Sequence, residues 1–504
     1  MAGRSPLRAV VLLAVVLAAL AGSLIARRST GHSNALSAVA PDVLRLGHLR
    51  LEPCTIGRAN AGIATARAYC AAVLVPENRR AANGRALRLK VAVVASESAQ
   101  PDADLIVFLD GGPGGAATED YPALAPAFAP LRKRHALLLI DQRGTGGSNP
   151  LDCGKEDSTV AAPTLQQLTE CLRELAPHAA PEFYTTSDAV EDLEAVRRTM
   201  GSPPLDLVAV SYGTRVAQQY ARTYGPAVRA MVLDGAVPNS LALGSEHAAN
   251  LEAVLRDLST RCRASAACAQ RYGDPYQTLR RAQARLRAEP QRVSLRDPYT
   301  FRVQEKLMTA DALAQLVRVY AYSPYTAALL PYVLQQAERG EYAPIMAQAQ
   351  AVVGDVTESL SSGVALSVSC AEDADRLRVD AAAADTILGN NLVSALLAAC
   401  PLWPHGARPK DFSAPLRGTL PVLVLAGEHD PVTPGRYAEA IVQTLPRARL
   451  LKLAGQGHGL LAVGCVPRLL EEFVRTLDAR SLDAHCLDVL AQTPPFVDAN
   501  GAGP

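Results

Sequence analysis

A serine, an aspartate and a histidine stand in this chain where nucleophilic catalysis would need them. Ser211 lies in VAVSYGTRVA (208–217), where an apolar run meets a helix-forming stretch. This is the Gly-x-Ser-x-Gly pattern of a nucleophile on a sharp strand-to-helix turn, with Ala209 replacing the first glycine. Asp430 ends the apolar stretch VLVLAGEHD, and His458 stands in the glycine-flanked loop AGQGHG after another apolar run.

These three side chains could act together as a catalytic triad. A serine hydroxyl becomes a good nucleophile when a histidine takes its proton and an acid orients that histidine. Taken alone, Ser211 also fits a tight bend and His458 a surface loop. Their order along the chain, each after an apolar run, predicts that Ser211, His458 and Asp430 form the triad. His429, beside the acid, is expected to be structural.

A glycine-rich loop upstream could hold the negative charge that develops on the attacked carbonyl oxygen. The run LIVFLDGGPGG places glycines directly after a strand-like segment. Backbone N–H groups aimed at the oxygen stabilise it. We expect Gly112 to supply one N–H group and Tyr212, which follows the nucleophile, to supply the other. A phosphate-binding loop is excluded because the Gly-Lys-Ser/Thr ending is missing.

The elements that must position these residues alternate between strand and helix patterns. Short apolar runs typical of strands buried on both faces occupy 105–109, 136–140, 205–210 and 228–234. Helical periodicity fills 187–200, followed by Gly201 at the position of a helix-terminating glycine. The same rhythm returns at 420–430 and 448–459. It predicts a mostly parallel sheet with helices on both faces.

The rhythm is interrupted in the middle of the chain, where helical patterns dominate and RVSLRDPYTFRVQ could form a hairpin. We therefore expect an α/β domain with a mostly helical cap inserted after the nucleophile half. The expected boundaries are a signal peptide or anchor at 1–28, the core at 29–240, the cap at 241–415, the rest of the core at 416–490, and a loose tail at 491–504.

The beginning of the chain predicts export. Arg4 and Arg8 precede an uncharged apolar run from Ala9 to Ala26, and Ala19-Leu20-Ala21 offers a small-x-small cleavage site. A retained anchor is the alternative, because about eighteen apolar residues can just span a bilayer. In both cases the body of the protein is expected outside the cytoplasm, periplasmic or secreted, with membrane contact only through a retained segment. The formal net charge of +1 argues against a nucleic-acid partner.

Ten cysteines agree with an oxidising compartment, where an even number predicts disulfides. Pairing each cysteine with its neighbour closes five short loops. A zinc site is disfavoured because the sequence has no Cys-x-x-Cys pair and no His-x-x-x-His cluster. The expected pairs are Cys54–Cys70, Cys153–Cys171, Cys262–Cys268, Cys370–Cys400 and Cys465–Cys486.

Several motifs together resemble one family. GGPGG, LLLIDQRGTGGSNPLDC, VSYGTRVA, LDGAVP and PVLVLAGEHDPVTP…GQGHG are similar to the proline iminopeptidase group of α/β-hydrolases, and to its exported tripeptidyl aminopeptidase branch. The resemblance covers most of residues 50–490 and is weakest in the cap. Departures are Ala209 at the elbow and Asp110, where iminopeptidases often carry histidine. Asp141 and Arg143 of DQRGTGGS are expected to be an internal ion pair or to support the loop.

The resemblance implies an α/β-hydrolase fold and a serine hydrolase that cleaves amide bonds near the N-terminus of short peptides through an acyl-enzyme. It implies no cofactor or metal, and a monomer is expected. A free N-terminal ammonium needs a carboxylate partner. Glu372 in SVSCAED resembles the branch's Cys-x-acid motif and is the first candidate, with Asp373 second. The alternative is that both are solvated loop acids.

Other functions remain open at this stage. A carboxylesterase or lipase-like enzyme would use the same three residues, because one fold hosts many chemistries. A catalytically inactive binding protein is disfavoured by the complete set of Ser211, Asp430 and His458. An epoxide hydrolase or dehalogenase would carry aspartate at position 211 and is excluded.

Overall fold

The computed structural model describes residues 43–58, 64–81, 83–152, 164–297, 301–348 and 360–502. All of them belong to one unit that begins at Val43. The signal peptide or anchor expected at 1–28 lies outside the described residues. Within them, no helix combines the length and the apolar character needed to cross a membrane.

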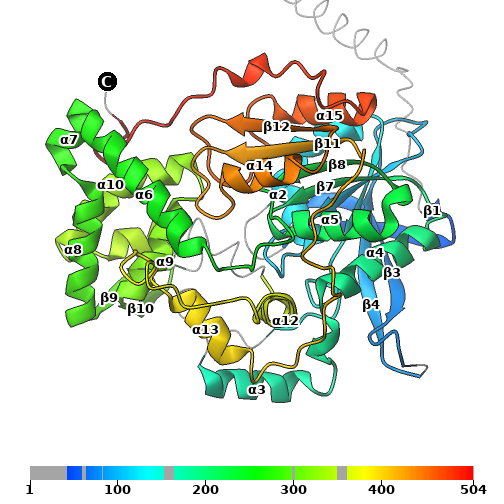
Figure 1. Cartoon of the computed structure of the whole chain (residues 1–504), viewed down its shortest axis with the longest axis horizontal. Helices are drawn as coiled ribbons and strands as arrows, with labels where there is room; N and C mark the ends of the chain where they lie inside the picture. Colours follow the sequence, from blue (N-terminus) through cyan, green and yellow to red (C-terminus); the bar gives the residue numbers. More distant parts are fainter. Residues whose placement is uncertain are drawn as a thin grey trace, which may run out of the picture. The chain divides into compact units, whose positions relative to one another are not determined.

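A ten-stranded sheet forms the core (Figure 1). Its order is β1-β2-β3-β4-β6-β5-β7-β8-β11-β12. The strands from β6 to β12 pair in parallel, while β1 to β4 form an antiparallel extension that joins at β6. The strands are β1 Leu44–Leu46, β2 Leu49–Ile56, β3 Ala66–Pro76, β4 Ala86–Val94, β5 Leu105–Leu109, β6 Ala136–Ile140, β7 Leu205–Val210, β8 Val228–Asp234, β11 Val422–Gly427 and β12 Ala448–Leu453.

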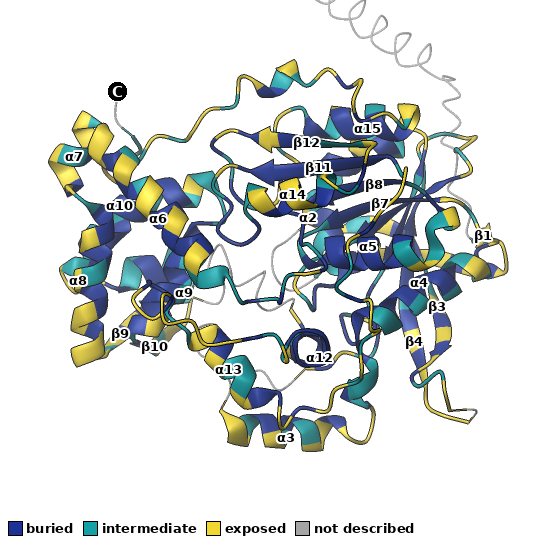
Figure 2. Cartoon of the chain, in the orientation of Figure 1, coloured by how far each residue is buried: buried dark blue, intermediate teal, exposed yellow. Residues whose placement is uncertain are grey.

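The central strands are buried because helices cover both faces of the sheet (Figure 2). In β5, Val107 packs into one apolar cluster and Phe108 into the other, as alternating side chains of a doubly covered strand must. Helices α2 and α15 contribute to the second cluster, and α3, α4, α5 and α14 to the first. These helices are α2 Ala117–Arg132, α3 Leu165–Leu175, α4 Thr186–Thr199, α5 Tyr212–Tyr224, α14 Gly435–Val442 and α15 Val466–Thr476.

Local signals in the sequence explain where these elements begin and end. Helix α4 begins at a capping box in which the Thr185 hydroxyl accepts from the Asp188 N–H and the Asp188 carboxylate accepts from Thr185. Gly201 follows the helix with φ of 88°, a conformation that favours glycine. The strands expected at 105–109, 136–140, 205–210 and 228–234 form with those bounds. The predicted α/β-hydrolase fold is confirmed.

The segment between β8 and β11 is mostly helical and carries its own apolar core, built by α6, α8, α9 and α10 with the hairpin β9–β10. The predicted hairpin is therefore confirmed. Helix α12 is buried nearly all round, as Figure 2 shows. The elements are α6 His247–Ala264, α7 Ala266–Tyr272, α8 Pro275–Ala288, β9 Gln291–Arg296, β10 Val303–Met308, α9 Ala310–Tyr320, α10 Pro324–Glu338, α12 Ser362–Glu372 and α13 Asn391–Ala399.

The end of the chain differs from the loose tail expected at 491–504. After α15 it crosses to the helical segment, as the red trace in Figure 1 shows. The Phe496 N–H donates to the Ala328 carbonyl at 2.9 Å, and the Tyr272 hydroxyl donates to the Val497 carbonyl. These hydrogen bonds, which on the tail's side use only backbone groups, attach the tail to α10 and α7.

Four of the five expected disulfides form. Their sulfur atoms are bonded and their Cα atoms lie 5.1 to 6.2 Å apart, in the range that a disulfide requires. The fifth, Cys153–Cys171, lies outside the described residues because Cys153 does. The confirmed pairs are Cys54–Cys70, Cys262–Cys268, Cys370–Cys400 and Cys465–Cys486.

Candidate active site

Ser211 occupies a strained turn between β7 and α5. Its φ of 54° and ψ of −124° are rare for a residue with a side chain and mark a backbone held by its surroundings. The Ser211 N–H donates to the Asp234 carbonyl at 2.8 Å. A Cβ on Gly213 would lie 2.3 Å from the Leu109 carbonyl oxygen, which explains this glycine of the motif. Ala209 is fully buried in β7, so its methyl group fits where the motif has glycine.

Asp430 and His458 form a buried acid–base pair beyond the ends of β11 and β12. The Asp430 Oδ2 and His458 Nδ1 atoms lie 2.7 Å apart. The other carboxylate oxygen accepts the N–H groups of Val432 and Thr433, both at 2.8 Å. The Thr433 hydroxyl donates to Asp430 Oδ2 at 2.7 Å. The carboxylate is thereby fixed toward the imidazole.

The electrostatics of this pair suit a general base and its orienting acid. Burial acts to raise the pKa of Asp430, but the charge and hydrogen bond of His458 outweigh it and hold that pKa below its usual value. Burial acts to lower the pKa of His458, but Asp430 outweighs it and raises that pKa above its usual value. Asp430 therefore stays ionised near neutral pH and stabilises a protonated His458.

Asp234, the last residue of β8, connects the serine turn to the histidine loop. Its carbonyl accepts from Ser211, while its carboxylate accepts the N–H groups of Leu460 and Leu461 at 2.6 and 3.0 Å. Burial raises the pKa of Asp234 to about 6, against the lowering effect of these N–H groups. A Cβ on the next residue, Gly235, would lie 2.9 Å from His458 Cε1, so the imidazole packs against this strand end. Ser211 and His458 are thus attached to one residue.

The loop after β5 lies beside the serine, as its proposed role requires. A Cβ on Gly111 would lie 3.1 Å from the Ser211 Cβ. Gly112 has φ of 114°, and a Cβ there would lie 2.6 Å from the Gly114 nitrogen. Within the described part of the chain, the N–H groups of Gly112 and Tyr212 donate to no protein acceptor. Both remain free to meet a substrate oxygen.

Asp110, which precedes this loop, is half-buried, with its Oδ2 atom covered. The Asp110 carboxylate accepts the Gly111 N–H at 2.7 Å. Burial and then the neighbouring Asp120 carboxylate raise the pKa of Asp110 well above its usual value. Asp110 therefore supports the glycine loop through its hydrogen bond with the Gly111 N–H.

The residues linking α9 to α10 contact the histidine. The Tyr322 backbone carbonyl accepts the backbone N–H of His458 at 2.8 Å. The Tyr322 and His458 rings meet edge-on, with centroids 5.3 Å apart. Sequence reasoning missed Tyr322, Asp234 and Thr433. Asp234 and Thr433 carried a weak signal, since one ends a strand and the other stands three residues after the acid. Tyr322 carried none.

Glu372 and Asp373 lie at the end of α12 in a buried network. Glu372 accepts the Thr186 N–H at 2.7 Å and the Thr186 hydroxyl at 2.9 Å, and it lies 3.5 Å from the Arg215 guanidinium. Asp373 accepts from Arg215 at 2.8 Å. Both acids are buried, so the alternative of solvated loop acids is wrong. The Thr186 hydroxyl also lies 2.7 Å from the Tyr212 hydroxyl, which connects the network to the residue after Ser211.

Burial raises the pKa of Glu372 to about 7, with the Arg215 charge acting against it. The start of α12 contacts the glycine loop, since the Ser361 N–H donates to the Gly114 carbonyl at 3.0 Å. Helix α12 therefore extends from the glycine loop to the base of α5, where it ends at Glu372.

Asp141 and Arg143 support loops and do not pair with each other. Asp141 accepts the N–H groups of Thr118 and Gly147, both at 2.9 Å. Arg143 is fully buried and pairs with Asp192 through two hydrogen bonds of 2.6 and 2.7 Å. Arg143 therefore forms its internal ion pair with Asp192 of α4 and not with Asp141. Asp141 supports its loop through hydrogen bonds.

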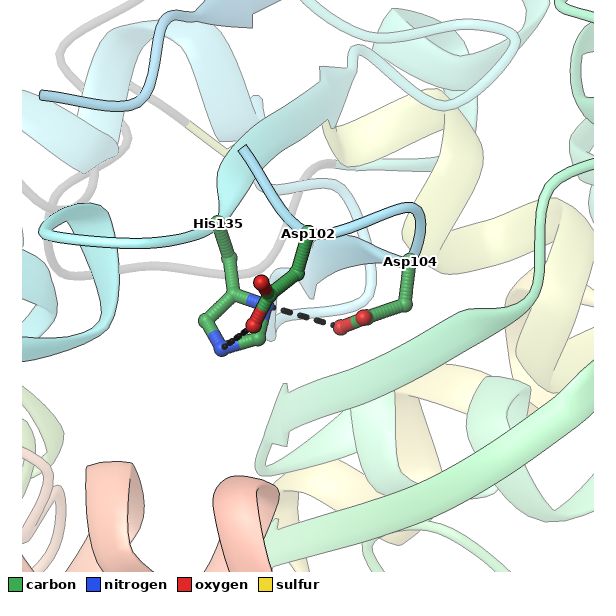
Figure 3. A group of neighbouring side chains, drawn as sticks. All are labelled: Asp102, Asp104 and His135. Atoms are coloured by element: carbon green, nitrogen blue, oxygen red, sulfur yellow. Dashed lines mark ion pairs between the residues drawn. The ribbon is translucent and has the colours of Figure 1, made fainter. Parts of the chain in front are cut away.

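One group among the described residues has the spacing of metal ligands (Figure 3). Asp102, Asp104 and His135 lie before β5 and β6, at the amino ends of the parallel strands and at the opposite edge from Ser211. Basic side chains already pair with both acids: Arg134 with Asp102 and Arg229 with Asp104, each at 2.8 Å. These residues form an ion-pair cluster at the N-terminal ends of β5, β6 and β8.

Comparisons with known proteins show the family to which this chain belongs. The family described as alpha/beta hydrolase fold matches residues 104–464. Serine protease Hip1 of Mycobacterium tuberculosis is 26% identical over 405 residues, covering 71% of this chain and 76% of that protein. Tripeptidyl aminopeptidase of Streptomyces lividans is 26% identical over 189 residues, covering 33% and 35%. The crystal structure of proline iminopeptidase from Mycobacterium smegmatis aligns with a TM-score of 0.40 and 18% identity, covering 80% of this chain and 98% of that one. The chain therefore belongs to the α/β-hydrolase family, with relatives named as serine peptidases and aminopeptidases.

Proposed function

We propose that this protein is an exported serine aminopeptidase that cleaves an amide bond near the N-terminus of short peptides. The observation that carries the proposal is the 2.7 Å contact between Asp430 and His458, attached through Asp234 to the strained turn of Ser211. The sequence relatives named as peptidases favour amide over ester substrates. The free N–H groups near the serine support a carbonyl substrate.

In the proposed reaction, Ser211 Oγ attacks the scissile carbonyl carbon while His458 Nε2 takes the hydroxyl proton. The carbonyl oxygen becomes negative and accepts the N–H groups of Gly112 and Tyr212. When the intermediate collapses, the C–N bond breaks and His458 gives its proton to the leaving amine. A water molecule, deprotonated by His458, then attacks the Ser211 ester. The ester C–O bond breaks, the N-terminal fragment leaves as a carboxylic acid, and His458 returns the proton to Ser211 Oγ.

Recognition of the free N-terminus would come from Glu372, with Asp373 as the second acid. The support is a buried carboxylate that reaches the Tyr212 hydroxyl through Thr186. A carboxylate oxygen has two lone-pair sites. Each Glu372 oxygen accepts one hydrogen bond from Thr186, and the Arg215 guanidinium lies 3.5 Å from Oε2, so Oε1 keeps capacity for an ammonium. Charge-assisted hydrogen bonds of this kind discriminate between a free and an acylated amine.

Export is supported by the four disulfides, which persist in oxidising compartments. A panel of aminoacyl, dipeptidyl and tripeptidyl 4-nitroanilides with free N-termini determines whether the enzyme releases one, two or three residues per cleavage.

The test compares that panel with the same anilides N-acetylated and with simple 4-nitrophenyl esters. The proposal predicts that free N-termini give the highest kcat/KM. Glu372→Gln should lower kcat/KM on free N-termini at least tenfold, about 1.4 kcal/mol, and leave the acetylated anilides nearly unchanged. Equal losses on both would assign Glu372 to the support of Tyr212. Hydrolysis of esters without any amide would identify a carboxylesterase instead.

A further inference from the structure

Arg318 is a basic residue close to the candidate site. It lies on α9, partly buried, and its guanidinium donates to the Gln315 side chain at 3.4 Å and to the Tyr322 hydroxyl at 3.1 Å. Among the described residues, no carboxylate lies within ion-pair distance of it. A partly buried cation without a counter-ion is costly, so such groups are usually paired.

The position of Arg318 relative to His458 is fixed through Tyr322. The guanidinium lies over the Tyr322 ring, 5.9 Å from its centroid. The edge of that ring contacts the His458 ring, with centroids 5.3 Å apart. An extended peptide spans about 3.5 Å per residue, so these two contacts place Arg318 within two or three residues of His458. The charge of Arg318 acts to lower the pKa of His458, as expected of a neighbouring positive charge.

The proposed reaction determines which part of the substrate reaches these residues. His458 delivers its proton to the leaving amine, so the leaving group must lie against His458. In the proposed function the acyl group extends toward Tyr212 and the Glu372 network. Arg318, which reaches His458 through Tyr322, would then meet the leaving peptide. The C-terminal carboxylate of that peptide is close to the scissile bond only when the peptide is short.

We propose that Arg318 forms a subsite for the C-terminal carboxylate of a leaving group of one to three residues. This inference rests on the proposed function. An arginine guanidinium binds a carboxylate through two parallel hydrogen bonds, which gives both affinity and orientation. The enzyme would thereby read both ends of a short peptide and select against long chains and C-terminal amides.

The test uses the N-terminal sequence that the anilide panel identifies, followed by a single alanine with a free carboxylate or with a carboxamide. The matched 4-nitroanilide has no carboxylate. The wild type should cleave the acid with kcat/KM at least tenfold higher than the carboxamide. Arg318→Gln should abolish this preference through KM, with a fold-loss at least tenfold larger on the acid than on the anilide, while Arg318→Lys should retain part of the preference. Arg339→Gln, at the exposed end of the next helix, should retain the preference in full.

Two results would overturn the subsite. One is equal cleavage of acid and carboxamide by the wild type. The other is an equal loss on all three substrates in Arg318→Gln, which would mean that Arg318 only positions Tyr322 and His458. If the enzyme cleaves none of the three, the proposed aminopeptidase function fails, which is a different outcome from cleavage without preference. Raising the salt concentration should reduce the preference of the wild type, because screening weakens the contact.

Discussion

The backbone carbonyl of Asp234 accepts a hydrogen bond from the Ser211 N–H, with the two atoms 2.8 Å apart. The carboxylate of the same residue accepts two N–H groups of the loop that follows His458. Asp234 therefore holds the turn of the candidate nucleophile and the loop of the candidate base in one arrangement. It contributes no reacting atom.

Removal of the Asp234 carboxylate should loosen the His458 loop. Asp234→Ala leaves the buried N–H groups of Leu460 and Leu461 without acceptors, which costs about 1–3 kcal/mol per unsatisfied group. We expect a lower free energy of unfolding in urea and a lower kcat. Asp234→Asn keeps a carbonyl oxygen in place and serves as the control, with smaller losses in both. A kcat equal to that of the wild type in Asp234→Ala would contradict this role.

Thr433 should act through Asp430. Thr433→Val keeps the shape of the side chain and removes the hydroxyl that donates to the carboxylate at 2.7 Å. A hydrogen bond to a charged group contributes about 1.5–3 kcal/mol, so we expect kcat/KM to fall at least tenfold. Thr433→Ser restores the donor and should recover most of the activity. If Thr433→Ser loses activity while Thr433→Val keeps it, the methyl group and its packing are what matter, and the hydroxyl is not.

The pH dependence should follow His458. As a base, it must be neutral before attack, and Asp430 raises its pKa above the usual 6.5 despite burial. The kcat/KM of the wild type should therefore rise with pH through a midpoint above 6.5. Asp430→Asn removes the charge responsible and should lower kcat by a factor on the order of 10⁴, the loss seen when a serine protease triad loses its acid. The check is a pH–rate profile from pH 5 to 9 with a soluble anilide. A midpoint below 6.5 in the wild type would contradict the assignment.

The disulfides should differ in their contribution to stability. Cys370–Cys400 closes a 30-residue loop beside α12, whereas Cys262–Cys268 closes one of 6 residues. Loop-closure entropy favours the longer bridge by about 1.4 kcal/mol. Replacing both cysteines of each pair by serine, followed by urea unfolding, measures the difference. Equal losses would mean that native-state packing, and not chain entropy, determines the contribution of these bridges.

Much of the fold could be predicted because its signals are local. The runs at 105–109 and 205–210 are buried on both faces and therefore continuously apolar, and each forms a strand with those bounds. The contacts of Asp234 and Thr433 depend on where neighbouring strands end in space. The partner of Arg143 is Asp192 of α4, which is distant in the sequence, whereas Asp141 was the expected partner because it is only two residues away. The tail appeared loose because its attachment uses backbone groups, which leave no trace in side-chain composition.

The proposed mechanism depends on Ser211 as the nucleophile. Covalent labelling by a fluorophosphonate, followed by mass spectrometry of the intact protein and of its peptides, tests this role directly. We expect one adduct per chain, located on Ser211, with loss of hydrolysis in proportion to labelling. Ser211→Ala should remain unlabelled and inactive, with an unchanged melting temperature because only one hydroxyl is removed. An adduct on another serine, or an active Ser211→Ala enzyme, would contradict the claim.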